Sequence, residues 1–143
     1  MKILVSACLL GTRCRYDGAS KAHPEIAALA ERHTLIPVCP EQLGGLPTPR
    51  TPAERQGVRV VTKTGSDVTE QYLRGAEETL KLCKLLGCEA AVLKERSPSC
   101  GCEEIYDGTF SGTLTAGDGV TAEVLKAQGI AVYGESQIEV LLK

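Results

Sequence analysis

The sequence predicts a single small α/β domain with a mostly parallel sheet flanked by helices. Short, continuously apolar segments alternate along the chain with longer segments in which apolar residues recur every three or four positions. Apolar runs of the first kind are typical of strands covered on both faces, and their alternation with helices is typical of a parallel sheet. The chain has 143 residues, the size of one ordinary domain, so we expect residues 1–143 to fold as one unit.

The strands are expected at 2–7, 34–38, 89–94 and 130–133. Helices are expected at 23–33, 68–86 and 120–128, with a short terminal helix at 136–142. Pro24 fits the first position of the first helix, and Asp67 with Glu70 has the pattern of a capping box before the longest one. Prolines and glycines exclude regular structure from 39–52, residues 105–119 form a second long loop, and an edge hairpin is expected within 58–68.

Composition points to a small-molecule partner. The net charge is −2 and no run of basic residues is present, so a protein that binds a phosphate backbone is not expected. With no Trp, one Phe and four Tyr, the chain gives little support for a platform on which nucleic-acid bases stack. No apolar segment approaches the length of a membrane span. We therefore expect no nucleic acid and no membrane as partner, and the sequence leaves the oligomeric state open.

The cysteine content indicates a reducing compartment. Seven cysteines, an odd number, favour reduced thiols in a cytoplasmic protein over a secreted disulfide scaffold. The segment Val5-Ser6-Ala7-Cys8 is similar to a lipoprotein cleavage site. However, the few residues before Cys8 leave no room for a proper apolar region, so no signal peptide is expected.

Three cysteines follow predicted strands directly: Cys8, Cys39 and Cys100. The carboxyl ends of parallel strands meet at one edge of the sheet, so these thiols are expected to converge there. Thiolates select zinc, copper(I) or iron-sulfur clusters over hard cations. The alternative is that they are three unrelated core cysteines, because free cysteine is among the most buried residue types. A turn signal after each of the three favours a shared site.

The spacing of the cysteines narrows the kind of metal site. The chain contains no C-x2-C, so a structural zinc knuckle and a thioredoxin-like redox pair are both poor fits. Three thiolates on a four-iron cluster would leave one iron open to a substrate, whereas a fourth would close the cluster as an electron carrier. Cys14 and Cys102 are the candidates for that fourth ligand, and the sequence leaves their role open.

Polar residues near the three cysteines favour the open cluster. Glu41, Asp17, Ser97 and Ser99 lie close in sequence to the candidate ligands and would supply acids, bases and hydroxyls to a bound molecule. Each also has a simpler interpretation, because Asp before Gly and Ser before Pro are common turn formers, and Glu41 could cap the turn after Cys39-Pro40.

Three motifs in this order resemble the thiouracil desulfurase family, and the resemblance covers essentially the whole chain. They are Val5-Ser-Ala-Cys-Leu-Leu-Gly11 with Cys14-Arg-Tyr-Asp-Gly18, then Cys39-Pro-Glu-Gln-Leu-Gly-Gly-Leu-Pro-Thr-Pro-Arg50, and then Arg96-Ser-Pro-Ser-Cys-Gly101. The resemblance implies a 4Fe-4S cluster held by Cys8, Cys39 and Cys100, whose open iron takes the sulfur of 2-thiouracil. The implied reaction gives uracil and hydrogen sulfide without net electron transfer.

The same resemblance suggests roles for the polar residues. Glu41 is favoured as the base that activates water and Asp17 is the second choice, while Ser97 and Ser99 would orient the heterocycle or donate to a developing anion. The main alternative is an iron-sulfur or zinc carrier or sensor without catalysis. A domain that acts on thiolated nucleosides in RNA is a further alternative, but the net charge of −2 does not favour binding to RNA.

Overall fold

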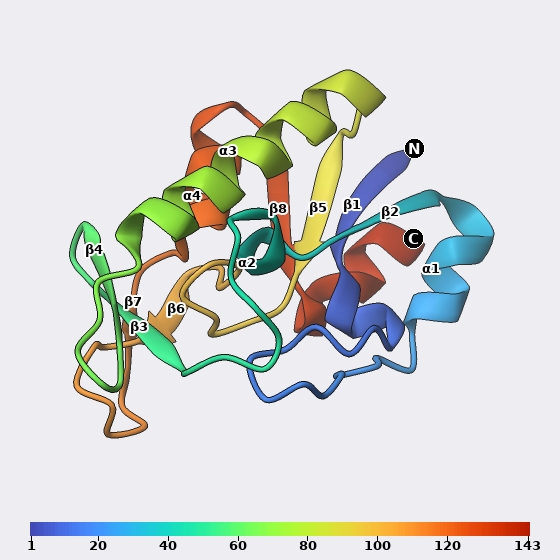
Figure 1. The fold of residues 1–143 in the computed structure, drawn as a ribbon. Coiled ribbons are helices and arrows are strands. Elements are labelled where there is room, and N and C mark those ends of the chain that lie inside the picture. The colour runs from blue at the N-terminus through green and yellow to red at the C-terminus, as the bar shows by residue number, and fades with distance from the viewer.

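A computed structural model describes residues 1–143 and has a four-stranded parallel sheet at its centre (Figure 1). The strand order is β2-β1-β5-β8. Its strands are β1 (Lys2–Ser6), β2 (Thr34–Val38), β5 (Ala90–Leu93) and β8 (Ala131–Gly134). The predicted parallel α/β architecture is confirmed, and all four strands lie within one or two residues of their expected positions.

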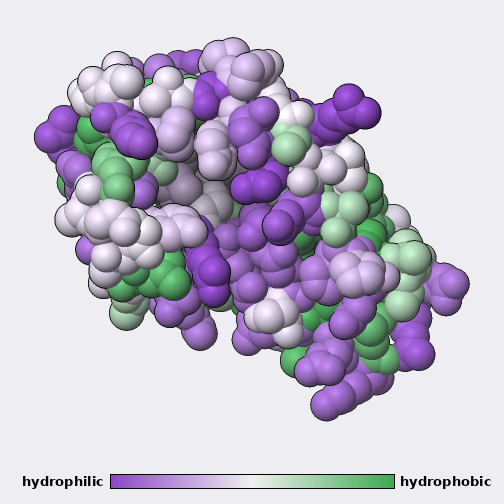
Figure 2. Space-filling model, turned by 90° about the horizontal axis from the view of Figure 1, so that it is seen from below, coloured by the Kyte–Doolittle hydropathy of each residue, from purple (hydrophilic) through white to green (hydrophobic).

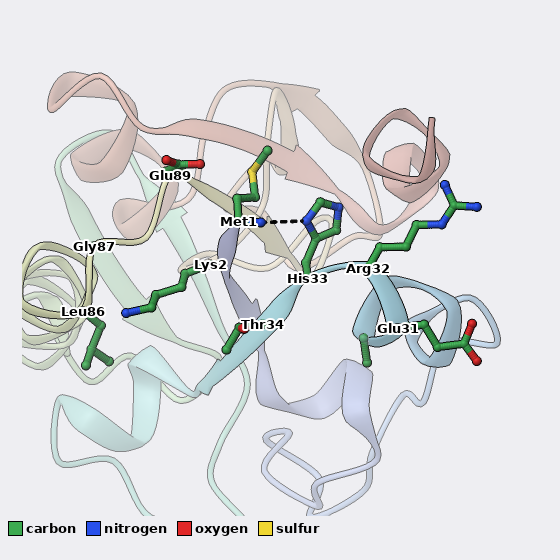
Figure 3. Close-up of a pocket in the computed structure, with 10 residues that line it drawn as sticks. Met1, Lys2, Glu31, Arg32, His33, Thr34, Leu86, Gly87 and Glu89 are labelled. Atoms are coloured by element: carbon green, nitrogen blue, oxygen red, sulfur yellow. Dashed lines mark hydrogen bonds between the residues drawn. The ribbon is translucent and has the colours of Figure 1, made fainter.

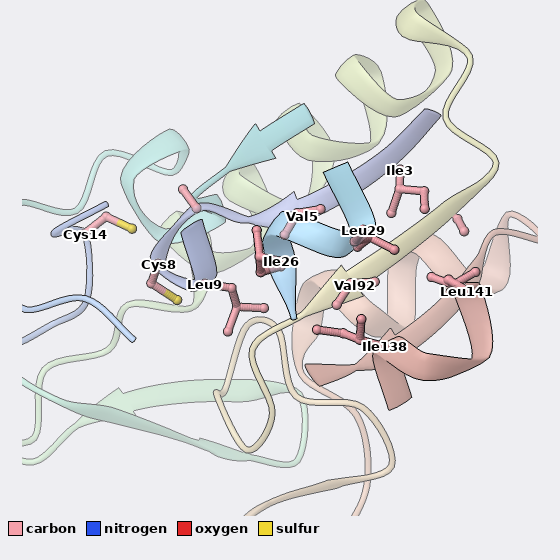
Figure 4. Close-up of a cluster of buried hydrophobic side chains, with 12 residues drawn as sticks. Ile3, Val5, Cys8, Leu9, Cys14, Ile26, Leu29, Val92, Ile138 and Leu141 are labelled. Carbon is pink, nitrogen blue, oxygen red and sulfur yellow. The ribbon is translucent and has the colours of Figure 1, made fainter. Parts of the chain in front are cut away.

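Helices cover both faces of this sheet. On one face lie α1 (Ile26–Arg32) and the 3-10 helix η2 (Glu135–Leu142), and on the other lie α3 (Thr69–Leu86) and α4 (Val120–Ala127) (Figure 1). Side chains of β1 alternate between the two cores: Ile3 and Val5 pack with Leu29 and Ile138 (Figure 4), whereas Leu4 points to the opposite face. The central strands β1 and β5 are buried on both faces, which explains why they are continuously apolar. No helix is long and apolar enough to cross a lipid bilayer.

The strand order reverses at β1, and this places a crevice at the carboxyl end of that strand. The chain passes from β1 to β2 on one side and later returns to β5 on the other. In parallel sheets of this kind, ligands bind outside the carboxyl ends of the strands where the order reverses.

Two predictions about helices were wrong. The helix α1 begins at Ile26 rather than at residue 23, because Pro24 lies in a turn in which the Glu25 N–H donates to the His23 ring, 3.2 Å away. A short helix, α2 (Pro40–Leu43), occupies part of the expected loop 39–52. A proline is compatible with the first helical position, since its missing N–H has no partner there in any case.

Two short antiparallel hairpins also differ from the prediction. The strands β6 (Glu104–Tyr106) and β7 (Leu114–Ala116) occupy parts of the segment 105–119, which was expected to be a continuous loop. The strand β4 (Arg59–Thr62) pairs with β3 (Ala53–Gln56), while only a single bridge joins it to Asp67.

The helix α3 begins within a residue of its expected start, but without the predicted capping box: Asp67 accepts the Thr69 N–H at 2.9 Å and Val68 is the N-cap.

The core cysteine Cys83 makes the stability of the fold sensitive to alkaline pH. Its side chain is fully buried in α3, and burial, with Cys88 nearby, raises its pKa from 9.0 to about 11. Above pH 9 the unfolded chain ionises at this thiol first, so the contribution is complete below pH 9 and is lost as the pH approaches 11. We expect the unfolding free energy of Cys83→Ala to fall less between pH 9 and 11 than that of the wild type, by on the order of 1–2 kcal/mol.

Urea unfolding at pH 8, 9, 10 and 11 measures this difference. Leu85→Ala, at an exposed position of the same helix, is the control and should keep the wild-type pH dependence. Equal losses in Cys83→Ala and the wild type would show that the buried thiol is not the source.

Candidate active site

A cavity of about 560 Å³ opens at the carboxyl ends of the central strands. It is bordered by the segments that follow β1, β2 and β5, and its walls include four thiols: Cys8, Cys14, Cys39 and Cys100. Figure 2 shows the molecule from this side, where the surface is hollowed and surrounded by mainly hydrophilic side chains. The structure therefore brings the three predicted cysteines to one cavity and adds Cys14 to them.

Each of the three predicted thiols is fixed by the turn that follows its strand. Cys8 lies in the 3-10 helix η1 (Ala7–Leu10), which Gly11 ends in a left-handed conformation with φ of 99°. Cys39 is the N-cap of α2. Cys100 lies in a tight turn in which the Gly101 N–H donates to the Ser97 carbonyl at 2.8 Å.

The two candidates for a fourth thiol differ in position. Cys14 is buried next to Cys8 at one end of the core cluster in Figure 4, and its backbone carbonyl accepts a contact from the Cys39 thiol at 3.7 Å. Cys102 lies outside the cavity, with its thiol 3.6 Å from the Val132 carbonyl. Only Cys14 is therefore close to the predicted ligands.

Burial favours the protonated form of Cys8, Cys14 and Cys100. It raises the pKa of Cys8 to about 11, although Lys94 opposes the shift, and it raises the pKa of Cys14 to about 12 with help from Cys39. The pKa of Cys100 is raised in the same way, while a hydrogen bond from Ser6 opposes the shift. A metal centre binds thiolates, so it would have to displace these protons. It would also have to stabilise the thiolate charge, because burial removes the water that does so in solution.

The donor set fits a metal cluster better than a single ion. Thiolates are soft ligands, and the Ser6 hydroxyl and Lys94 ammonium can stabilise negative charge on sulfur. One tetrahedral zinc ion needs its sulfur ligands within about 4 Å of one another, given a Zn–S bond of about 2.3 Å. No three His, Cys, Asp or Glu side chains in the chain are arranged so that they could hold one metal ion. A cluster places its thiolates on different metal atoms and so tolerates wider spacing.

Three carboxylates line the cavity, those of Glu41, Glu54 and Glu95, and that of Glu41 is firmly anchored. Its Oε1 accepts hydrogen bonds from Arg50 Nε and from the Tyr72 hydroxyl, both at 2.9 Å. Its Oε2 lies 3.5 Å from Ser97 Oγ. Burial alone would lower the pKa of Arg50, but the Glu41 carboxylate more than offsets it and the pKa is raised.

A close helix crossing brings Glu41 to Tyr72. A Cβ atom on Gly44, just after α2, would overlap the Gln71 carbonyl of α3, and one on Gly75 would overlap the Pro40 carbonyl. The two backbones therefore touch at these glycines. Residues one turn earlier on each side, Glu41 and Tyr72, come within hydrogen-bonding distance as a result.

The other three predicted polar residues have different positions. Ser97 lines the cavity, and its Oγ also accepts the N–H groups of Ser99 and Cys100, both at 3.1 Å, so it shapes the turn as well. Ser99 does not face the cavity, because its hydroxyl is buried against Thr121 Oγ1 at 2.8 Å. Asp17 also lies outside the cavity, where its Oδ1 accepts the Ala19 N–H at 2.9 Å. Ser99 and Asp17 therefore each make a structural hydrogen bond, and neither lines the cavity.

Residues of the hairpins form the mouth of the cavity, which sequence reasoning did not predict. Tyr106 and Phe110 line the mouth together with Tyr16 from the segment after η1. Glu54 of β3 joins the two hairpins, since its Oε1 accepts the N–H groups of Gly108 at 2.9 Å and Phe110 at 3.1 Å.

A second depression, of about 660 Å³, lies at the opposite ends of the strands. It is more open, and its walls include Met1, Arg32, His33 and Glu89 (Figure 3). The His33 ring there contacts the N-terminal amine through Nδ1 at 3.2 Å and the Leu141 carbonyl through Nε2 at 2.8 Å, so both nitrogens are occupied. No cysteine lines this depression, and we assign the site to the thiol-lined cavity.

Comparison with known proteins identifies the family. The sequence matches the profile described as 2-thiouracil desulfurase over residues 3–137. The chain belongs to the 2-thiouracil desulfurase family. A curated relative, the uncharacterized protein YbbK of Bacillus subtilis (strain 168), is 45% identical over 150 residues, covering 98% of this chain and 99% of the relative. A solved structure of the [4Fe-4S]-dependent thiouracil desulfidase TudS has 51% sequence identity and a TM-score of 0.90, covering 98% of this chain and 94% of that one.

This membership confirms the family resemblance seen in the motifs, and the likeness to TudS confirms the fold class. The part of the chain that matches the 2-thiouracil desulfurase profile includes every cysteine and polar residue of the cavity described above.

The helix crossing at Gly44 and Gly75 is required for the packing of α2 on α3. We expect Gly75→Ala to lower the free energy of unfolding by about 2 kcal/mol or more, because the added methyl group overlaps backbone atoms that have little freedom to move. Urea unfolding at pH 7 measures the effect. Leu85→Ala on the exposed side of α3 should change the free energy by less than about 0.5 kcal/mol. A Gly75→Ala protein as stable as the wild type would show that the helices can separate at no cost.

Proposed function

We propose that this protein removes sulfur from 2-thiouracil or a closely related thiolated pyrimidine, using a [4Fe-4S] cluster held by Cys8, Cys39 and Cys100. The family and the likeness to TudS support the reaction and the cofactor. The observation that carries the proposal is the cavity itself, where thiols from three strand ends share one space with an anchored carboxylate. With three ligands from the protein, the bound cluster would supply a Lewis-acidic iron able to take the sulfur of the substrate.

The overall reaction is a hydrolysis. Water adds at the thiocarbonyl carbon, the carbon-sulfur bond breaks, and 2-thiouracil plus water becomes uracil plus hydrogen sulfide. No electrons are gained or lost, so the protein's task is to move protons and to orient the reactants.

Glu41 is the residue suited to take a proton from the attacking water. Its Oε1 is engaged by Arg50 and Tyr72, while its Oε2 is directed toward Ser97 on the cavity wall. Ser97 Oγ already accepts two backbone N–H groups, so its own hydrogen is available for Glu41 or for a polar atom of the substrate. Glu41 therefore acts as the general base and Ser97 as an orienting donor.

The setting of the site supports the remaining parts of the proposal. All seven cysteines are free, which suits a reducing compartment, and we place the protein in the cytoplasm. The substrate is a small molecule rather than nucleic acid, in keeping with the net charge of −2. Residues 1–143 act as one desulfurase domain, most of which the family profile spans.

The ligand set can be tested by anaerobic reconstitution with iron and sulfide. We expect Cys8→Ala, Cys39→Ala and Cys100→Ala each to lose bound iron and acid-labile sulfide, together with hydrogen sulfide release from 2-thiouracil. Cys102→Ala is the matched control and should retain both, because its thiol lies outside the cavity. One equivalent of zinc without iron would contradict the proposal, and a full cluster without sulfide release would keep the cofactor but reject the substrate.

The base can be tested separately from the cofactor. We expect Glu41→Gln to keep the iron content and to lower kcat for sulfide release by about 10²- to 10⁴-fold, the usual contribution of general acid–base catalysis. Asp17→Asn should stay within about threefold of the wild type, because Asp17 serves a turn outside the cavity. Steady-state kinetics on iron-loaded protein distinguishes the two carboxylates, and the opposite ranking would make Asp17 the base.

A further inference from the structure

We propose that Tyr72 and Arg50 are positioning residues that hold one oxygen of the Glu41 carboxylate and leave the other as the only oxygen available for proton transfer. This inference rests on the proposed function, in which Glu41 is the base. It adds two residues to the machinery, and neither was among the catalytic residues predicted from the sequence.

The two donors reach the same oxygen from different parts of the chain. Tyr72 comes from α3 and Arg50 from the segment after α2, and each lies 2.9 Å from Glu41 Oε1. Both side chains are buried: Arg50 is 6% exposed and Tyr72 is 2% exposed. A carboxylate oxygen with two such donors has its lone pairs engaged, so Oε2 alone remains for water.

Arg50 is itself fixed by further hydrogen bonds. Its Nη1 donates to the Pro47 carbonyl at 3.1 Å and to Thr48 Oγ1 at 2.9 Å, and its Nη2 donates to the Cys14 carbonyl at 2.9 Å. The planar guanidinium therefore has little freedom to rotate. The same Cys14 carbonyl accepts the contact from the Cys39 thiol, so Arg50 joins the base to the loop that carries a candidate ligand.

Tyr72 adds a donor that remains protonated. Burial, with the Glu41 carboxylate adding to it, raises the pKa of Tyr72. Its hydroxyl therefore keeps its hydrogen at every pH at which the enzyme would work, and continues to donate to Oε1. Proton transfer is slower when the carboxylate can rotate out of the productive orientation. Two fixed donors restrict the rotation of the Glu41 carboxylate before the substrate binds.

A double-mutant cycle tests this role. We expect Tyr72→Phe, which removes only the hydroxyl, to lower kcat for sulfide release from 2-thiouracil by about tenfold. KM and iron content should stay within about twofold of the wild type. If Tyr72 acts through Glu41, Tyr72→Phe should have no further effect when it is combined with Glu41→Gln. Tyr133→Phe, a half-buried tyrosine outside the cavity, is the control and should match the wild type.

A structural readout separates this inference from the proposed function. Crystal structures of Tyr72→Phe and Tyr133→Phe should show a displaced or disordered Glu41 carboxylate in the first variant only. An unmoved carboxylate in Tyr72→Phe, or an equal loss of kcat in the Glu41 and Glu41→Gln backgrounds, would overturn the inference. If the wild type releases no sulfide while the carboxylate moves in Tyr72→Phe, the anchoring is correct and the proposed reaction is wrong.

Discussion

All four strands of the central sheet run in the same direction, and this forces the turns that follow them onto one edge. Because these turns lie close together, the backbone N–H and C=O groups of each must find hydrogen-bond partners within a crowded region. The turn at Cys100 does so by sharing partners with α4, because the Val120 N–H donates to the Pro98 carbonyl and the Thr121 N–H to the Ser99 carbonyl, both at 2.8 Å. The cavity is thus walled by segments that hold one another in place, and its thiols have fixed positions before any cofactor binds.

Groups that are expensive to bury are concentrated in this cavity. A buried ion pair such as Arg50 and Glu41 loses the hydration of both charged groups, and the Coulomb attraction alone seldom offsets that loss. Here the other two nitrogens of Arg50 and the second lone pair of Glu41 Oε1 each find a partner, which is the condition under which such a pair is tolerated. The protonated thiols add to the same cost once they must ionise. Stability and function oppose each other at this edge, and the apolar clusters on both faces of the sheet carry the fold.

The sequence was most informative where local pattern and topology agree. Cys8, Cys39 and Cys100 each follow an apolar strand, so a parallel sheet was sufficient to predict that they meet. The helix α2 was missed because a segment rich in proline and glycine has no helical periodicity, although Pro40 is well suited to begin a helix. Tyr72 falls on the apolar stripe of α3, a pattern that is typical of a core residue. Its hydroxyl meets Glu41 only because two glycines let the helices touch, and no spacing along the chain reports such a contact.

The carboxylate of Glu54 links the two hairpins at the mouth of the cavity. It receives the amides of Gly108 and Phe110, while Gln56 of the same strand donates through Nε2 to the Gly108 carbonyl at 2.8 Å. Phe110 has a φ of 57°, a left-handed conformation that is uncommon for an aromatic residue. The hydrogen bond from the Phe110 N–H to Glu54 stabilises this conformation. The two hairpins are therefore coupled as one rim. A change in the length of either hairpin would be transmitted to the other through Glu54 and Gln56, so neither side of the opening could move alone.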